Sequence, residues 1–352
     1  MSRAQSAMFR VVPALNQARA ASTTSAAICT KLGAPLTYGD WTLPELQKGE
    51  VKVKVAGTGV NFAELLQTKG QYQEVKEPPF VPGNECAGEV TETYPGSKLS
   101  VGDQVICLAR GDAYACDVIA HEAACIKLPE KAQGRDLCEA AALLVNYGTA
   151  HLALENRANM KPGETVLVTA AAGGVGLAAI ELANLMGAGK VIAAVGSSDK
   201  LKIARSKGAA EEGIIYSGLD SKGVRAAIKA SAPKNLDVVI DMVGSHVLEP
   251  SLRSLNWGGR GVVIGFAGGD IPKIPSNILL VKNISVHGLF WGAHMVHDPK
   301  TLINSANKLV DWWLAGDITP HICEKVSLDK VNDAFELLGS RKSTGKVVLV
   351  PP

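Results

Sequence analysis

Apolar and polar positions follow two different patterns along this chain. In the first third, residues 51–55 (VKVKV) alternate with a period of two, as in a strand with one buried face. Three more short runs of strand-forming residues follow at 86–93, 104–108 and 124–128, separated by Gly and Pro. This part of the chain predicts an irregular β-rich domain.

Beyond Gly148, apolar runs of strand length alternate with helical patterns. The predicted strands are residues 165–171, 190–196, 213–217, 236–243 and 261–266. Continuous apolar runs of this kind favour a parallel sheet that is covered by helices on both faces. Residues 285–291 and 346–350 predict two more strands, separated by an amphipathic helix at 299–315 that carries Leu302, Leu309, Trp313 and Leu314. The order predicts an α/β fold with two domains.

The composition is that of an ordinary globular protein, with 47% hydrophobic and 20% charged residues. The formal charge of +2 is too balanced for a surface that binds nucleic acid or an anionic membrane. The most apolar stretch, residues 166–180, is well short of the ~20 residues of a membrane span. Seven cysteines without a C-x-x-C pair indicate reduced thiols inside a cell. We expect a soluble protein with no nucleic-acid or membrane partner.

The first 24 residues have a composition of their own. Arg3, Arg10 and Arg19 punctuate a run rich in Ala and Ser, and no Asp or Glu occurs before Asp40. This composition is typical of a mitochondrial transit peptide. The sequence therefore predicts import into the mitochondrial matrix, with residues 1–24 removed and the formal charge lowered from +2 to −1. The alternative is a tail with no targeting role on a cytoplasmic protein, and Pro13 limits any helix in this segment.

The stretch TVLVTAAAGGVGLAAIELANLMG combines an apolar strand, a glycine-rich turn and a helix. Ala171, Gly173 and Gly176 have the spacing of a dinucleotide-binding G-x-G-x-x-G turn, and the strand and helix around them are the required context. Small residues let the backbone approach a pyrophosphate, and the helix N-terminus supplies N–H groups. The alternative is that the small residues only ease the packing of helix against strand.

The strand that follows is expected to end beside the adenosine ribose of a dinucleotide. NAD-binding proteins usually place an acidic residue there, whereas this chain has Gly196, Ser197 and Ser198. Asp199 is expected to cap the next helix. Because Lys200 and Lys202 follow and no carboxylate would repel a 2'-phosphate, we predict NADPH rather than NADH. Alternatively, Lys200 is only a solvated helix residue.

Several motifs occur together in a fixed order. They are GVNFAELLQTKGQY (59–72), PPFVPGNECAGEV (78–90), VGDQV (101–105), AAAGGVG (170–176), LDVVIDMVG (236–244), VIGFAGGDIPKIP (263–275) and GLFWG (288–292). In these motifs the chain resembles the quinone oxidoreductase branch of the medium-chain dehydrogenase/reductase superfamily. The resemblance implies a GroES-like catalytic domain from residues 25–148 and 286–352, with a Rossmann domain, a doubly wound parallel sheet, inserted at 149–285. It also implies a homodimer.

The resemblance further bears on metal binding. Where zinc alcohol dehydrogenases carry Cys and His ligands, this chain has Asn61 or Phe62 and Asn84. Glu85 remains, but one carboxylate cannot build the three-ligand site that catalytic zinc needs. An H-x-x-H pair, His294 and His297, has no third ligand nearby in the sequence. We therefore predict no metal and zinc-independent catalysis.

The resemblance implies a set of site residues. Asn61 would lie at the nicotinamide and the substrate, and Tyr72 at the mouth of the same cleft as a hydrogen-bond donor or proton source. The cofactor would be held by Asn146 and Thr149 at the domain junction, Gly173, Gly174, Val175 and Gly176 at the pyrophosphate, Gly196, Ser197, Lys200 and Tyr216 at the 2'-phosphate, Phe266, Phe290 and Trp291 at the nicotinamide, and Arg341 at the phosphates. Each has a plainer alternative: Asn61 as a turn residue, Tyr72 and the other aromatics as core packing, and the run Arg341, Lys342 and Lys346 as a solvated turn.

The predicted function is hydride transfer from NADPH to a quinone or an α,β-unsaturated carbonyl compound. Without a metal to polarise a carbonyl, hydride transfer works best on an acceptor that delocalises the incoming charge. The alternative is an NADPH-binding protein with an idle cleft and a structural or sensory role, because a fold alone does not guarantee activity.

Overall fold

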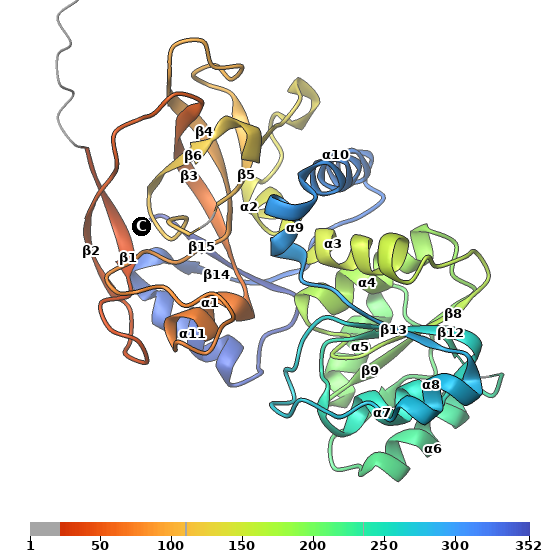
Figure 1. The fold of residues 1–352 in the computed structure, drawn as a ribbon. Coiled ribbons are helices and arrows are strands. Elements are labelled where there is room, and N and C mark those ends of the chain that lie inside the picture. Colours follow the sequence, from red (N-terminus) through yellow and green to blue (C-terminus); the bar gives the residue numbers. More distant parts are fainter. Residues whose placement is uncertain (1–21, 110, 235) are drawn as a thin grey trace, which may run out of the picture.

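A computed structural model describes residues 22–109, 111–234 and 236–352. It confirms the predicted α/β fold, with one β-rich unit and one unit built on a parallel sheet (Figure 1). Of the predicted transit peptide, residues 1–21 lie outside the described residues, and the first strand of the described part begins at Thr23. No helix among the described residues is long and apolar enough to cross a membrane.

The β-rich unit is assembled from both ends of the chain. Its seven-stranded sheet has the order β14-β15-β3-β4-β5-β7, with β6 paired to β3, and a separate two-stranded sheet joins β1 to β2. In β3 the predicted alternation is present, since Val51 and Val53 are fully buried and the neighbouring Lys54 is exposed. The strands are β1 (Thr23–Ile28), β2 (Thr37–Thr42), β3 (Glu50–Val60), β4 (Glu85–Thr93), β5 (Gln104–Leu108), β6 (Asp117–His121), β7 (Cys125–Lys127), β14 (Ile322–Ser327) and β15 (Lys346–Val350).

Short helices cover this sheet. They are α1 (Phe62–Thr68), α2 (Leu137–Ala141) and α11 (Val331–Gly339), with single 3-10 turns η1 (Glu122–Ala124), η2 (Glu130–Ala132) and η5 (Leu328–Lys330). Helix α11, near the C-terminus, packs beside α1 from the N-terminal half of the chain. The two ends of the chain therefore share one unit.

The second unit is a six-stranded parallel sheet with the order β10-β9-β8-β11-β12-β13. The first strand of this array, β8, lies in the middle, and the chain runs first to one side and then to the other. The point where the strand order reverses, between β8 and β11, is where doubly wound sheets bind ligands at their carboxyl ends. The strands are β8 (Thr165–Val168), β9 (Lys190–Val195), β10 (Ile214–Ile215), β11 (Leu236–Asp241), β12 (Leu255–Val263) and β13 (Ser285–Gly288).

Helices lie on both faces of the parallel sheet and at its junction with the β-rich unit (Figure 1). The sheet helices are α4 (Gly174–Leu185), α5 (Ser198–Ser206), α6 (Ser221–Ser231), α7 (Ser245–Arg253) and α8 (Ser276–Lys282). At the junction lie α3 (Leu144–His151), the π-helical turn η3 (Leu152–Arg157), η4 (Trp291–Ala293), α9 (His294–His297) and α10 (Pro299–Ala315). Helix α10 has the predicted bounds.

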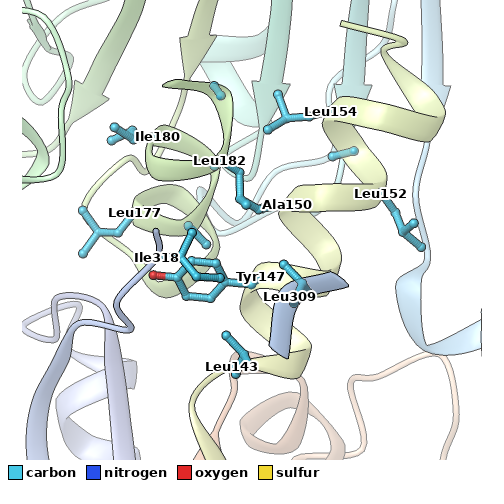
Figure 2. Packing of buried hydrophobic residues seen from close by; sticks show 14 of the residues in the cluster. Leu143, Tyr147, Ala150, Leu152, Leu154, Leu177, Ile180, Leu182, Leu309 and Ile318 are labelled. Carbon is cyan, nitrogen blue, oxygen red and sulfur yellow. The ribbon is translucent and has the colours of Figure 1, made fainter. Parts of the chain in front are cut away.

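One buried cluster joins the two units. It contains Ile106 of the β-rich sheet and three residues of α3. Figure 2 shows Tyr147 and Ala150 of α3 together with Leu177 of α4 and Leu309 of α10. Leu302, Leu309 and Trp313 of α10 are buried, as predicted, whereas Leu314 is only half-buried. The Trp313 indole N–H donates to Glu139 Oε2 at 3.0 Å, so the polar atom of this buried ring is satisfied. The junction is therefore packed as part of the core.

The sequence pattern missed some strands and misplaced another. Strands β1, β2, β6 and β14 were not predicted, because their residues are mixed in polarity and several are exposed. Strand β12 begins at Leu255, six residues before the predicted start at Gly261, because its first half has two glycines and the exposed Trp257 in place of a continuous apolar run. Strand β13, at the predicted domain boundary, pairs with β12 in the parallel sheet. The boundaries at 148/149 and 285/286 themselves stay a prediction.

Candidate active site

The glycine-rich turn lies at the reversal point of the parallel sheet. It connects β8 to α4, and Gly173 is the N-cap of the helix. Ala170 takes the left-handed conformation, with φ of 45°, while φ at Ala171 stays outside that region, as its fit in a tight turn requires. A Cβ on Gly176 would lie 2.5 Å from the Ala170 carbonyl oxygen, so Gly176 serves helix-to-strand packing. A Cβ on Gly173 would meet only that oxygen, at 3.3 Å, so the turn is open there.

The N-terminus of α4 faces α3 and the C-terminal segment. A Cβ on Gly174 would lie 2.1 Å from Asn146 Nδ2, so this asparagine closely approaches the first turn of the helix. Asn146 and Thr149 are both buried on α3. A small cavity here is lined by residues of both units, including Asn146, Gly174 and Lys346. The predicted junction residues therefore lie where the two units meet.

Two basic residues, Lys200 and Arg341, lie close together beyond the end of β9. Lys200 Nζ donates to the Arg341 carbonyl oxygen at 2.6 Å, and the Arg341 guanidinium donates to the Ala267 carbonyl oxygen at 2.8 Å. Burial and the nearby Arg341 lower the pKa of Lys200, and burial raises the pKa of Tyr216, against the opposing charge of Arg341. Lys200, Tyr216 and Arg341, from three distant parts of the chain, thus lie close together. Lys200 is half-buried and Arg341 is exposed, so their role at the cofactor phosphates stays a prediction.

The cap of α5 differs from the prediction. Ser197, beside Gly196, is the N-cap, and its Oγ accepts from the Lys200 N–H at 3.4 Å. The expectation that Asp199 caps this helix is wrong, because Asp199 lies in the first turn and pairs with Lys202 at 3.0 Å. The carboxylate of Asp199 is therefore already occupied by a lysine.

The predicted aromatic residues differ in their surroundings. Tyr72 and Phe290 meet edge to face, with ring centroids 6.1 Å apart. Phe290 and Phe266 are partly exposed, at 42% and 36%. Trp291 is buried against Gly148, where an added Cβ would lie 2.7 Å from its Nε1. Among the described residues, this indole N–H has no hydrogen-bond partner. Trp291 thus packs in the interior, and Tyr72 and Phe290 line a partly open edge.

Asn61 is the N-cap of α1, directly after β3, and it is buried. Its backbone N–H donates to Glu64 Oε2 at 2.9 Å, which forms half of a capping box. Its side-chain Nδ2 lies 3.2 Å from both Glu64 Oε1 and Glu85 Oε1, and its Oδ1 accepts from Lys346 Nζ at 2.5 Å. The amide of Asn61 is therefore held in one orientation by the side chains of Lys346, Glu64 and Glu85.

These side chains belong to a buried network of Asn61, Glu64, Asn84, Glu85 and Lys346. Lys346 Nζ also donates to Glu85 Oε1 at 2.5 Å, and Glu85 Oε2 accepts from the Val145 N–H at 2.9 Å. Glu64 Oε1 accepts from both the backbone N–H and the Nδ2 of Asn84. Burial raises the pKa of Glu64 to about 7, although Lys346 opposes this shift. The ammonium group of Lys346 thus bonds Glu85 directly and acts on Glu64 only through its charge.

Tyr72 lies near this network. Burial, together with the negative charges of Glu64 and Glu74, raises the pKa of Tyr72 to about 12. The phenol therefore remains protonated at neutral pH and can donate a hydrogen bond.

The sequence reasoning missed Glu64 as a site residue and gave Lys346 only as part of a basic run. The signal for Glu64 was present, since an Asn followed three residues later by a Glu is a capping-box pattern. For Lys346 the alternative of a solvated turn is wrong, because its side chain is 3% exposed. It lies 285 positions from Asn61, so no local pattern could pair them.

The structure also bears on the H-x-x-H pair. His294 Nδ1 lies 3.1 Å from the Trp291 carbonyl oxygen and 3.3 Å from that of Phe290, so this nitrogen donates to backbone acceptors. Within the described parts of the chain, no group of three or more His, Cys, Asp or Glu side chains is arranged to hold a metal ion.

Two family models match the chain. One, described as alcohol dehydrogenase GroES-like domain, matches residues 47–151, and the other, described as zinc-binding dehydrogenase, matches residues 174–308. Among curated proteins, quinone oxidoreductase-like protein 2 of Mus musculus is 45% identical over 326 residues, which are 92% of this chain and 91% of that protein.

Solved structures agree over nearly the whole length. The quinone oxidoreductase of Thermus thermophilus, also solved in complex with NADPH, has a TM-score of 0.78 and 34% identity, covering 93% of this chain and 99% of its own. The Escherichia coli quinone oxidoreductase complexed with NADPH has a TM-score of 0.81 and 27% identity, covering 94% and 100%.

Proposed function

Because this chain belongs to the quinone oxidoreductase branch of the medium-chain dehydrogenase/reductase superfamily, we propose that it is an NADPH-dependent oxidoreductase. The proposed acceptors are quinones or α,β-unsaturated carbonyl compounds, and the proposed reaction proceeds without zinc. The observation that carries the zinc-free part of this proposal is the position of Lys346 in the buried network.

Lys346 supports the metal-independent part of the proposal. Its ammonium group lies 2.5 Å from Glu85 Oε1, the one carboxylate that the chain retains where zinc enzymes of the superfamily have ligands. Asn61 Oδ1 accepts from the same ammonium group. A divalent cation in this place would meet the buried positive charge of Lys346. The two carboxyl groups of the network, Glu64 and Glu85, are one fewer than the three protein ligands that catalytic zinc takes. The description zinc-binding, which belongs to one family model, is therefore not proposed for this chain.

The residues present fit NADPH. The turn at Gly173, the uncapped N–H groups at the start of α4 and the approach of Asn146 suit a pyrophosphate. The paired cations Lys200 and Arg341, next to the Ser197 hydroxyl, suit the 2'-phosphate. We propose the other predicted contacts at the same cofactor: Thr149, Gly174, Val175, Gly176, Gly196, Tyr216, Phe266, Phe290 and Trp291.

NADPH, when bound, supplies the hydride. The chain's own residues then have to stabilise the negative charge that develops on the acceptor oxygen. We assign this part to Tyr72, whose phenol is protonated at neutral pH and stands at the partly open edge beside Phe290. The side chain of Asn61 is held in place by Lys346, Glu64 and Glu85. We propose that this fixed amide contacts the nicotinamide or the substrate.

The test is oxidation of NADPH by the purified protein with a panel of ortho-quinones and alkenals. Tyr72→Phe keeps the ring contact with Phe290 and removes the hydroxyl, so it should lower kcat roughly 100-fold with little change in the Kd for NADPH. Tyr94→Phe, just after β4 in the same unit, is the control and should retain wild-type turnover. Equal turnover of Tyr72→Phe and wild type would remove the proposed role of Tyr72.

The same assay separates the two candidate functions. Tight NADPH binding without turnover of any acceptor would favour the structural or sensory alternative. Metal independence is tested separately, by measuring the zinc content of the active protein and its turnover after dialysis against a chelator. One bound zinc per chain and loss of turnover would contradict the zinc-free mechanism.

We also propose a homodimer and a mitochondrial location. Strand β13 is the edge strand of the parallel sheet and is the predicted pairing edge. Light scattering after gel filtration tests the dimer, and a monomer would refute it. A full-length fluorescent fusion tests import, and a diffuse cytosolic signal would favour the cytoplasmic alternative.

A further inference from the structure

Three cysteine thiols line up across the β-rich sheet. The register places Cys86 of β4 opposite Cys107 of β5, and Cys107 opposite Cys125 of β7. The Sγ atoms of Cys107 and Cys125 are 3.3 Å apart, within the distance of a thiol-thiol hydrogen bond. All seven cysteines are free thiols.

The hydrogen-bond pattern between β5 and β7 explains why the side chains of Cys107 and Cys125 lie so close together. The Cys125 N–H donates to the Glu122 carbonyl oxygen, and the flanking Leu128 N–H donates to the Gln104 carbonyl oxygen. The alternation of antiparallel bonds therefore makes Cys107 and Cys125 a non-hydrogen-bonded pair, with closely spaced side chains. Such pairs lie within the range of Cα separations that a disulfide can span.

Cys86 is placed differently relative to Cys107. The Ala109 N–H donates to the Asn84 carbonyl oxygen, so the same alternation makes Cys86 and Cys107 a hydrogen-bonded pair. The side chains of such pairs are farther apart. Of its two thiol neighbours, Cys107 is therefore better placed to bond Cys125.

The two thiols differ in access to solvent. Cys107 is fully buried, whereas Cys125, at the start of the short strand β7, is half-buried. Hydrogen bonds with the Cys125 and Cys86 thiols, together with burial, raise the pKa of Cys107 well above its ordinary range, so Cys107 remains a thiol. An oxidant from solvent meets Cys125 first and has no access to Cys107.

We propose that Cys107 and Cys125 are a reversible oxidation site, at which a hydroperoxide converts the two thiols to one disulfide. The Cys125 thiolate attacks the peroxide, which breaks the O–O bond, gives a sulfenic acid on Cys125 and, with hydrogen peroxide, releases one water after protonation. The Cys107 sulfur then displaces the hydroxyl of the sulfenic acid, and its proton leaves with that group as a second water. Two thiols are thereby oxidised and one peroxide is reduced to two waters.

This site is separate from the proposed active site. Glu85, next to Cys86 in β4, points to the opposite face of the sheet because successive side chains alternate. The thiols instead belong to a cluster with Val53, Val105 and Val118. Oxidation therefore links β5 to β7 and leaves the buried network untouched.

The experiment treats the purified full-length protein with stoichiometric hydrogen peroxide and maps disulfides by mass spectrometry under non-reducing conditions. We expect loss of two hydrogens from the intact mass, a Cys107–Cys125 cross-linked peptide, and recovery of both thiols with dithiothreitol. A bond from Cys107 to Cys86, or no intramolecular bond, would overturn the proposal.

Two variants separate the steps. Cys107→Ser removes the resolving thiol, so the sulfenic acid on Cys125 should persist and be trapped by dimedone. Cys125→Ser should abolish both the disulfide and the trapped adduct at this site. Cys116→Ser is the matched control, because Cys116 is also half-buried but has a hydrogen bond with Tyr38. This variant should form the Cys107–Cys125 disulfide like wild type. Dimedone labelling of Cys107 in place of Cys125 would refute the proposed order.

Discussion

The sharpest test of the buried network is the replacement of Lys346 by methionine. Methionine keeps an unbranched apolar side chain of similar length and removes the ammonium group. Lys346 is 3% exposed and Glu85 is fully buried, so water cannot take over the solvation of Glu85. The substitution leaves the carboxylate with its hydrogen bonds from Val145 and Asn61 but without a counter-ion.

Breaking a buried ion pair by removing one partner typically costs about 3 to 5 kcal/mol, because an uncompensated charge stays in the interior. We therefore expect Lys346→Met to lower the free energy of unfolding by this amount, which is a large part of the total for an ordinary domain. Removing both charges in Lys346→Met/Glu85→Gln should cost less than Lys346→Met alone, because the isolated carboxylate is gone.

The assay is urea unfolding at neutral pH, followed by tryptophan fluorescence and far-UV circular dichroism. The control is Lys325→Met on the neighbouring strand β14, where Lys325 pairs with Asp136 at 2.6 Å but both side chains are nearly half exposed. This exposed pair should contribute only about 0 to 1 kcal/mol. A similar, small effect for Lys346→Met and Lys325→Met, or a double variant less stable than Lys346→Met, would refute the reasoning.

Three further changes test other parts of the molecule. Burial raises the pKa of Glu64 from 4.5 to about 7, so the folded protein holds a proton there that the unfolded chain has lost, and the free energy of unfolding falls as pH rises from about 4.5 to 7. In Glu64→Gln this fall in the free energy of unfolding should be smaller by about 3 kcal/mol, measured by urea unfolding across this pH window. An unchanged pH dependence would contradict the raised pKa of Glu64. Arg341→Ala should weaken NADPH binding roughly 10-fold or more and leave NADH binding unchanged, measured by fluorescence titration, and equal losses for both would argue against a 2'-phosphate contact. Leu309→Ala in the junction core should cost about 2 to 5 kcal/mol in urea unfolding, whereas Leu280→Ala, at an 80% exposed position, should change stability by about 0.5 kcal/mol or less; equal effects would contradict the packing.

Much of the fold was readable from local pattern. Period-two alternation predicted β3, and continuous apolar runs predicted the parallel strands, because burial on one or two faces directly fixes which positions are apolar. The amphipathic pattern predicted the helix at about Pro299–Ala315, and in the structure Asp298 caps its start and Gly316 its end. Strands such as β2 were invisible, because a half-exposed strand tolerates mixed residues.

The sequence by itself determined the class of fold, the glycine-rich turn and, through its ordered motifs, the family. It placed Asn61, Tyr72 and the cofactor residues by resemblance, without showing what any of them contacts. Only the tertiary structure decided that Lys346 bonds the Asn61 side chain and that Lys200 bonds the Arg341 carbonyl oxygen, because each pair joins residues more than 140 positions apart. Cys107 and Cys125 are likewise neighbours only through strand register. Local signals act over a few residues, whereas charge pairing and thiol contact depend on which strands the folded chain places side by side.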